Sequence, residues 1–175
     1  MSTIVKTALE QTIQGLKNNP ADSKAIFEAK AVLGENVNVN VGVRQFEFKF
    51  DEPQALGGAD QDPNPVEYVL ASLGACQAIV YRALASLKGI KLDDVIVNTK
   101  GHLDLNGFLG LDKNARPGFS KVEFETTIVS EESTETIERL AAQVEALCPV
   151  LDIIANPVEV VGKVIVQKSD PALAN

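Results

Sequence analysis

The sequence predicts an α+β fold in which antiparallel sheets pack on helices. Three segments carry apolar residues at helical spacing, and several shorter segments alternate apolar with other residues. The expected order is helix, strands, helix, two strands, helix and a last strand. These helices are too few to cover both faces of a parallel sheet, which disfavours a doubly wound fold. A chain of 175 residues most simply forms one domain.

The N-terminal part predicts one helix followed by antiparallel strands. Residues 3–17 have the helical spacing, and the pattern stops before Pro20. Between residues 24 and 51 the apolar period changes to two, with a turn at 34–36. The alternation slips by one position near Arg44, where we expect a turn or a bulge. The apolar positions of the helix are Ile4, Leu9, Ile13 and Leu16.

The central helix has the clearest start signal in the chain. It follows a polar loop, residues 52–63, that is rich in glycine and proline. Asn64 can cap the helix, Pro65 suits its first position, and Glu67 can reach back to the amide of the cap. We expect the helix to end at about Lys88, because a glycine follows.

The C-terminal half predicts two strands, a helix and one more strand. The two strands are expected at residues 93–105 and 119–129, with a glycine-rich loop between them. A helix begins near Ser133 and ends at Cys148, because the residue before a proline is biased out of the helical conformation. The last strand is expected at about residues 158–167.

Composition and charge exclude several classes of partner. The chain has 24 acidic and 16 basic residues and a net charge of -8, with no clustering of lysine and arginine. This balance disfavours nucleic acid and an anionic membrane surface as partners. We expect no apolar run to reach the ~20 residues that span a bilayer, and the N-terminus lacks the layout of a signal peptide. The sequence therefore predicts a cytoplasmic protein.

The two cysteines, Cys76 and Cys148, are the candidate reactive groups. A structural disulfide is not expected in the cytosol, where thiols are kept reduced. A single histidine, His102, and the lack of a CxxC pair do not support a metal site. Two interpretations stay open at this point: two free thiols that fill the core, or a redox pair.

The surroundings of the two cysteines differ. Cys76 lies in the apolar stripe of the central helix, and no charged residue stands three or four positions to either side. A thiol reacts as its thiolate, so an activating cation would have to come from elsewhere in the fold or from a partner subunit. Cys148 is expected at a helix C-terminus, where carbonyl groups disfavour a thiolate. That position suits a thiol that reacts second.

Three stretches of the sequence resemble the OsmC/Ohr family of osmotically inducible and organic-hydroperoxide-resistance proteins, in its OsmC-like branch. They are residues 51–77, 107–124 and 139–160. The most specific feature is the combination of a Gly-Gly loop, an Asn-Pro helix start, a cysteine in that helix and a later Cys-Pro. The resemblance divides the single domain into an N-terminal helix with the first strand (1–35), an OsmC-like part (36–168) and a C-terminal tail (169–175).

The resemblance implies an intertwined homodimer in which antiparallel sheets wrap long central helices. It also implies a thiol-dependent peroxidase that reduces organic hydroperoxides, with H2O2 as a second substrate to test. Cys76 matches the cysteine that attacks the peroxide and becomes a sulfenic acid. Cys148 matches the cysteine that then forms a disulfide with it. No metal and no bound cofactor are implied, whereas an external dithiol reductant, lipoyl or another thiol, is required.

Arg44 and Glu67 are the candidate activators of the thiolate. In the well-characterised peroxidases a glutamate follows the Asn-Pro pair directly, but that position is Val66 here and the carboxylate is one residue later. Nine positions on an ideal helix place Glu67 about 180° from Cys76, so it is equally well explained as a capping residue. The alternative is therefore a non-catalytic, dimeric binding or redox-sensing protein of the same fold.

Overall fold

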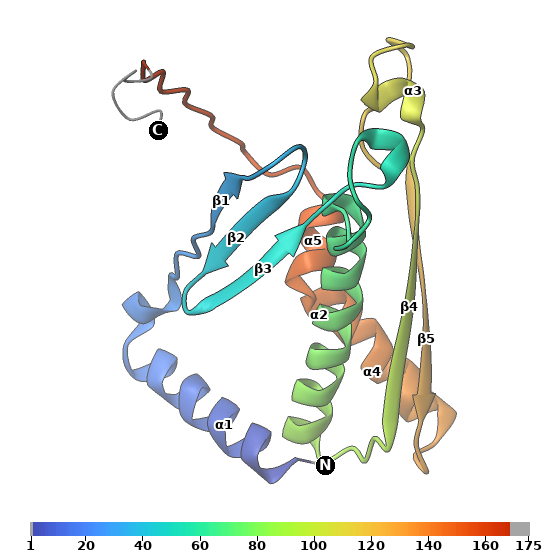
Figure 1. Ribbon diagram of the computed structural model, residues 1–175. Coiled ribbons are helices and arrows are strands. Elements are labelled where there is room, and N and C mark those ends of the chain that lie inside the picture. Colours follow the sequence, from blue (N-terminus) through green and yellow to red (C-terminus); the bar gives the residue numbers. More distant parts are fainter. Residues whose placement is uncertain (1, 169–175) are drawn as a thin grey trace.

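A long helix, α2 (Pro65–Lys88), runs through the middle of the structure, and the other elements surround it (Figure 1). The computed structural model describes residues 2–168. Strands β1, β2 and β3 form one sheet and β4 and β5 form another; both are antiparallel, which confirms the predicted α+β class. The remaining elements are α1 (Thr3–Asn18), η1 (Pro20–Ser23), β1 (Lys30–Leu33), β2 (Val39–Val43), β3 (Phe46–Phe50), η2 (Gln54–Leu56), β4 (Asp94–His102), α3 (Leu105–Phe108), β5 (Lys121–Val129), α4 (Thr134–Leu147) and α5 (Pro149–Ala155).

The ends of α2 follow the signals in the sequence. The side chain of Asn64 accepts the N–H of Glu67 at 2.9 Å, and the carboxylate of Glu67 accepts the N–H of Asn64 at 2.8 Å. Together these bonds make the predicted capping box, which satisfies two amides that the first turn leaves free. Gly89 ends the helix with a φ of 74°, a conformation that costs glycine little.

The sheet of β1, β2 and β3 lies beside the N-terminal half of α2. Val41 stands opposite Phe48 in the register of β2 and β3. The two strands are joined by the turn that was predicted near Arg44, whose φ is 55°. The rings of Phe48 and Phe50 pack on Tyr68 of α2, with ring centroids 5.6 and 4.3 Å away. This aromatic contact holds the sheet against the helix.

The first strand is shorter than predicted. The alternation from residue 24 onward suggested a strand, but β1 begins only at Lys30, which pairs with Gly42. Since β2 ends one residue later at Val43, residues 24–29 have no strand to pair with. Ile26 and Phe27 are consequently about 90 % exposed in the single chain (90 % and 92 %).

The hairpin of β4 and β5 covers another side of α2. The two elements lie close at Gly74, where an added Cβ would be in ordinary van der Waals contact, 3.5 Å from both the Val97 carbonyl oxygen and a methyl carbon of Thr99. The hydroxyl of Thr99 also donates to the Leu70 carbonyl at 3.2 Å. The hairpin therefore contacts α2 both by packing at Gly74 and by this hydrogen bond.

The core lies where α2, α4 and the hairpin meet. Its buried members are Tyr81, Ala85, Leu92, Leu140 and Val144. Helix α1 packs on the far half of α2, where the N–H of Ser2 donates to the hydroxyl of Ser86 at 3.3 Å. Thus α1, α4 and the hairpin of β4 and β5 all pack on α2.

The C-terminal region differs most from the expectation. Helix α4 ends as predicted, but a second helix, α5, starts at Pro149, whose fixed φ suits the first helical position. The predicted strand at 158–167 is wrong for the single chain: no strand among residues 2–168 pairs with this segment, and its side chains are exposed. Figure 1 shows it leaving the body of the protein. The predicted tail, 169–175, lies outside the described residues.

Helix α2 is also long and apolar enough to cross a membrane by length and composition alone. An 18-residue stretch of α2 has a mean hydropathy of 1.4. This corrects the expectation that no apolar segment is long enough to cross a bilayer. The core helix of a globular protein passes the same test, and α2 carries β4, α1 and α4 on its sides. Only 28 % of this 18-residue stretch is buried within the chain, so much of the apolar helix is uncovered.

The loop between β3 and α2 is organised around the buried carboxylate of Asp51. This group accepts the N–H groups of Glu52, Ala59 and Gln61 at 2.9 to 3.2 Å. The Glu52 amide contributes most to holding the pKa of Asp51 below its usual value. Gly58 lies inside this loop, where an added Cβ would come within 1.7 Å of the Glu52 carbonyl oxygen.

Replacing Gly58 by alanine should therefore destabilise the protein. We expect Gly58→Ala to lower the free energy of unfolding by at least ~1–3 kcal/mol, because a backbone atom would have to move. Gly15→Ala is the matched control: its Cβ would meet nothing within 4 Å in helix α1, so a gain of about 1 kcal/mol is expected. Urea unfolding measures both, and equal effects of the two changes would contradict the clash.

Candidate functional site

The two cysteines lie in contact although 72 residues separate them in the sequence. The sulfur of Cys148 lies 3.4 Å from the sulfur of Cys76, with the thiol of Cys148 as donor. Both cysteines are free. A disulfide needs the sulfurs at about 2.05 Å, so a small movement would allow the bond to form.

Cys76 is presented by the middle of α2. It is partly exposed, whereas Leu73, three residues before it, is fully buried. Its direction from the helix axis therefore lies at the edge of the buried face rather than at its centre. Cys76 is thus the more exposed of the two cysteines, and its sulfur contacts Cys148.

Cys148 is held between two helices. Its backbone is extended, with φ −79° and ψ 108°, because Pro149 follows it. The side chain is only 1 % exposed. Burial is the main cause that raises the pKa of the Cys148 thiol, while the amides of Leu151 and Val150 oppose the shift and the neighbouring Cys76 adds to it.

This arrangement refines the expectation that Cys148 lies at a helix C-terminus, where carbonyl groups disfavour a thiolate. Helix α4 does end at this cysteine, but α5 begins there, and the first free amides of α5 point at the sulfur. Burial outweighs these amides, and Cys148 keeps its proton for the hydrogen bond to Cys76. The pair thus combines one accessible sulfur with one buried proton donor.

The other two candidate residues lie elsewhere in the single chain. The guanidinium of Arg44 stacks over the ring of Phe46 at 5.3 Å, in the turn between β2 and β3. The carboxylate of Glu67 is engaged in the capping box. Among residues 2–168, neither side chain forms a hydrogen bond with Cys76.

One polar residue beside the thiols was missed by the sequence analysis. Gln77 follows Cys76 directly and is 1 % exposed, and its amide nitrogen has no hydrogen-bond partner among the described residues. The hydroxyl oxygen of Thr126 on β5 is also buried and has no hydrogen-bond partner among the described residues. A glutamine one turn from the buried Leu73 and Tyr81 was the signal that could have revealed it.

His102 is the last residue of β4 and lies at one end of the hairpin. It pairs with Glu123, which also pairs with Lys121. Lys121 and then His102 lower the pKa of Glu123 to about 2. In the part of the chain that the structure describes, no group of three His, Cys, Asp or Glu side chains could hold a metal ion.

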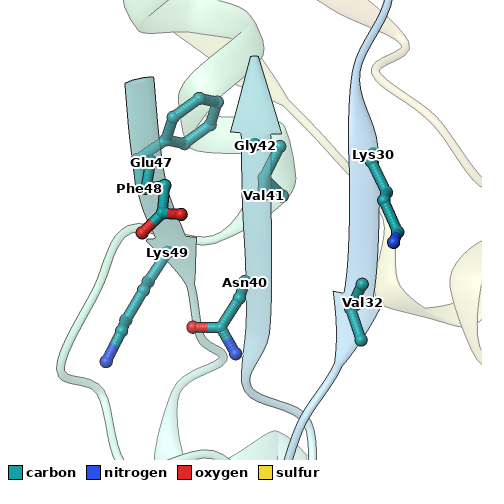
Figure 2. Close-up of a pocket in the computed structure, with 8 residues that line it drawn as sticks. All are labelled: Lys30, Val32, Asn40, Val41, Gly42, Glu47, Phe48 and Lys49. Atoms are coloured by element: carbon teal, nitrogen blue, oxygen red, sulfur yellow. The ribbon is translucent and has the colours of Figure 1, made fainter. Parts of the chain in front are cut away.

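A hollow of about 540 Å³ lies over the sheet of β1, β2 and β3 (Figure 2). Lys30 on β1 and Glu47 on β3 flank Gly42 of the middle strand, which adds no side chain between them. None of the lining residues belongs to the helices that carry the thiols. This hollow is therefore separate from the cysteine pair.

Comparison with known proteins identifies relatives of this arrangement. The family described as OsmC-like protein matches residues 57–162. An OsmC-like protein from Mycoplasma pneumoniae has a similar structure, with a TM-score of 0.66 and 20 % identity over 75 % of this chain and 89 % of the other. An organic hydroperoxide resistance protein OsmC from Legionella pneumophila has a TM-score of 0.57 and 24 % identity, over 75 % of this chain and 90 % of the other.

A third structure, an organic hydroperoxide resistance protein from Elizabethkingia anophelis, has a TM-score of 0.57 and 24 % identity, over 74 % of this chain and 88 % of the other. The TM-scores establish that these proteins share the fold of this chain. The chain matches no curated protein sequence. The family match nevertheless spans more than half of the 175 residues and includes both cysteines. The chain therefore belongs to the OsmC-like protein family.

Proposed function

We propose that this protein is a thiol-dependent peroxidase that reduces organic hydroperoxides. The observation that carries the proposal is the 3.4 Å contact between one accessible and one buried cysteine sulfur. The family match supports it, because relatives of the same fold from Legionella pneumophila and Elizabethkingia anophelis are described as organic hydroperoxide resistance proteins.

The proposed cycle has two chemical steps at the cysteines. The Cys76 thiolate attacks the terminal oxygen of the hydroperoxide, the O–O bond breaks, and the leaving alkoxide takes a proton to become an alcohol. Cys76 is then a sulfenic acid. The Cys148 sulfur attacks the Cys76 sulfur, a disulfide forms, and water leaves. An external dithiol, lipoyl or another thiol, reduces the disulfide by exchange and is itself oxidised.

The roles of the two cysteines follow from their exposure. A peroxide from solution can reach the partly exposed Cys76, but not the buried Cys148. The raised pKa of Cys148 keeps it protonated until the partner sulfur has been oxidised. Cys76 is thus assigned as the attacking thiol and Cys148 as the resolving thiol.

The proposal includes a homodimer. Most of the 18-residue apolar stretch of α2 is uncovered in the single chain, and Ile79 within it is 68 % exposed. The C-terminal segment at 158–167 is likewise apolar and unpaired. A second copy that packs α2 against α2 and pairs this segment would bury both surfaces. In such a dimer we assign Arg44 and Glu67 as the activators of the Cys76 thiolate.

A second candidate function is a binding or redox-sensing protein without fast peroxide turnover. The capping box favours it, because it engages Glu67 and places Val66 where a catalytic carboxylate is expected in the peroxidases. The separation of Arg44 from the thiols in the single chain points the same way.

Peroxide consumption separates these two functions. The reduced protein should consume cumene hydroperoxide with a dithiol present, and Cys76→Ser should abolish this activity because the attacking sulfur is gone. Cys148→Ser should react once and stop at a sulfenic acid that dimedone traps. If the wild-type protein consumes peroxide no faster than Cys76→Ser, the sensing or binding function replaces the peroxidase.

Alkylation tests the division of roles. Because burial raises the pKa of Cys148, a smaller fraction of it is thiolate at pH 8 than of an ordinary cysteine, and the sulfur is also shielded. We expect iodoacetamide to label Cys76 first and Cys148 only at higher pH or after unfolding, as read by peptide mass mapping. Faster labelling of Cys148 would reverse the two assignments.

The homodimer is tested by mass in solution. Light scattering should give twice the 18.7 kDa of the chain. Ile79→Asp places a charge on the uncovered side of α2 and should shift the protein to monomer. Leu111→Asp, at an equally exposed site on the hairpin loop, is the matched control and should leave the mass unchanged. A wild-type monomer at micromolar concentration would refute the assembly.

A further inference from the structure

The loop that joins β4 to β5, residues 103–120, presents a group of large apolar side chains to the outside. All four lie between residues 105 and 111, and each is more than half exposed, from 51 % to 73 %. They are Leu105, Phe108, Leu109 and Leu111, and together they form the apolar tip of the hairpin. Grouped exposed apolar side chains mark a site of interaction with a protein or a membrane.

The backbone under the apolar tip is held by its own hydrogen bonds. Every amide from Asn106 to Asp112 donates to an oxygen of residues 104–107, at 2.8 to 3.5 Å. Gly107 also lies directly against the returning chain, since an added Cβ would come within 2.3 Å of the Arg116 carbonyl oxygen. The apolar side chains therefore project from a compact frame whose amides are already used.

The apolar tip carries no net charge, although the chain as a whole is acidic. Residues 103–120 contain two acidic side chains, Asp104 and Asp112, and two basic ones, Lys113 and Arg116, so the whole net charge of -8 lies outside this loop. Both carboxylates accept N–H groups of the loop. The apolar tip is consequently a neutral part of the molecule.

The apolar tip also projects from the body of the protein. Helix α3, which lies within the loop, stands at the far end of β4 and β5, at the opposite end of the molecule from α1 (Figure 1). A projecting tip can enter a fluid surface without a complementary cavity in its partner.

These features fit a lipid surface better than a protein surface. Protein interfaces carry about one hydrogen bond per 100–200 Å², whereas hydrocarbon offers no partner to a backbone amide. A run of amides that is satisfied within the loop therefore suits an apolar solvent. The neutral charge suits zwitterionic head groups, while the acidic remainder of the chain would be repelled by anionic ones.

We propose that the apolar tip docks this protein on the surface of a zwitterionic lipid bilayer. The four side chains would enter the boundary between head groups and acyl chains, and the rest of the chain would stay outside the bilayer. This is peripheral binding and not a membrane span. It requires no reaction at the cysteines, so it stands apart from the proposed peroxidase function.

Vesicle flotation tests the docking. The wild-type protein should float with phosphatidylcholine vesicles, and Leu111→Asp should weaken this binding about tenfold or more, because a charge replaces a leucine that enters the bilayer. Including anionic phosphatidylglycerol should weaken the binding of the wild-type protein at low salt. A wild-type protein that does not float with phosphatidylcholine, or that needs the anionic lipid, would overturn the proposal.

Ile4→Asp is the matched control. This isoleucine is 84 % exposed on α1, at the other end of the molecule, so the same change of charge there should leave the flotation unchanged. Loss of flotation in Ile4→Asp but not in Leu111→Asp would assign the membrane contact to α1 and refute the apolar tip. A lower mass of Leu111→Asp in light scattering would show that a second copy covers the tip, which also refutes the docking.

A tryptophan placed in the apolar tip reports its depth. The chain has no tryptophan of its own, so Phe108→Trp gives a single signal. Its emission should shift to shorter wavelength when phosphatidylcholine vesicles are added, and phosphatidylcholine with brominated acyl chains should quench it. An emission that is the same with and without vesicles would contradict insertion of the tip.

Discussion

The sulfur of Cys148 reaches Cys76 because Pro149 interrupts the chain between α4 and α5. The proline forces an extended backbone at Cys148, and the two helices then leave the sulfur in different directions. The same break places the first amides of α5 at this sulfur and buries it against α2. If the helix continued through this point, neither the burial nor the thiol contact would have its present form.

The second constraint is that one chain leaves large apolar surfaces uncovered. Helix α2 is as apolar as a core helix, yet most of it is not buried, and the segment at 158–167 has no neighbouring strand among the described residues. Burial of such surface is the main favourable term in association. A second copy would account for both surfaces, and it would also bring new side chains toward the thiols. Among residues 2–168, no hydrogen bond joins a cationic side chain to Cys76, and Arg44 stacks on Phe46 instead.

Much of the fold was predictable because its signals are local. The capping box defines the start of α2, the slip in the alternation defines the turn at Arg44, and the long register of β4 with β5 follows the predicted strands. The failures share one cause. Strand patterns at 24–29 and 158–167 describe which residues could pair, but a strand forms only where another strand lies beside it. Helix α5 was not predicted, although Pro149, which ends α4, also suits the first position of a new helix.

The sequence by itself determined the local geometry of the site: a thiol within an apolar helix, and a second thiol held extended before a proline. Through its resemblance to the OsmC/Ohr family, the sequence also indicated that the two thiols react with each other. Only the tertiary structure decided that they lie 3.4 Å apart and that Cys148 is the buried one. The reason is physical. Backbone conformation depends on near neighbours in the chain, whereas burial and contact depend on packing between segments that are distant in sequence.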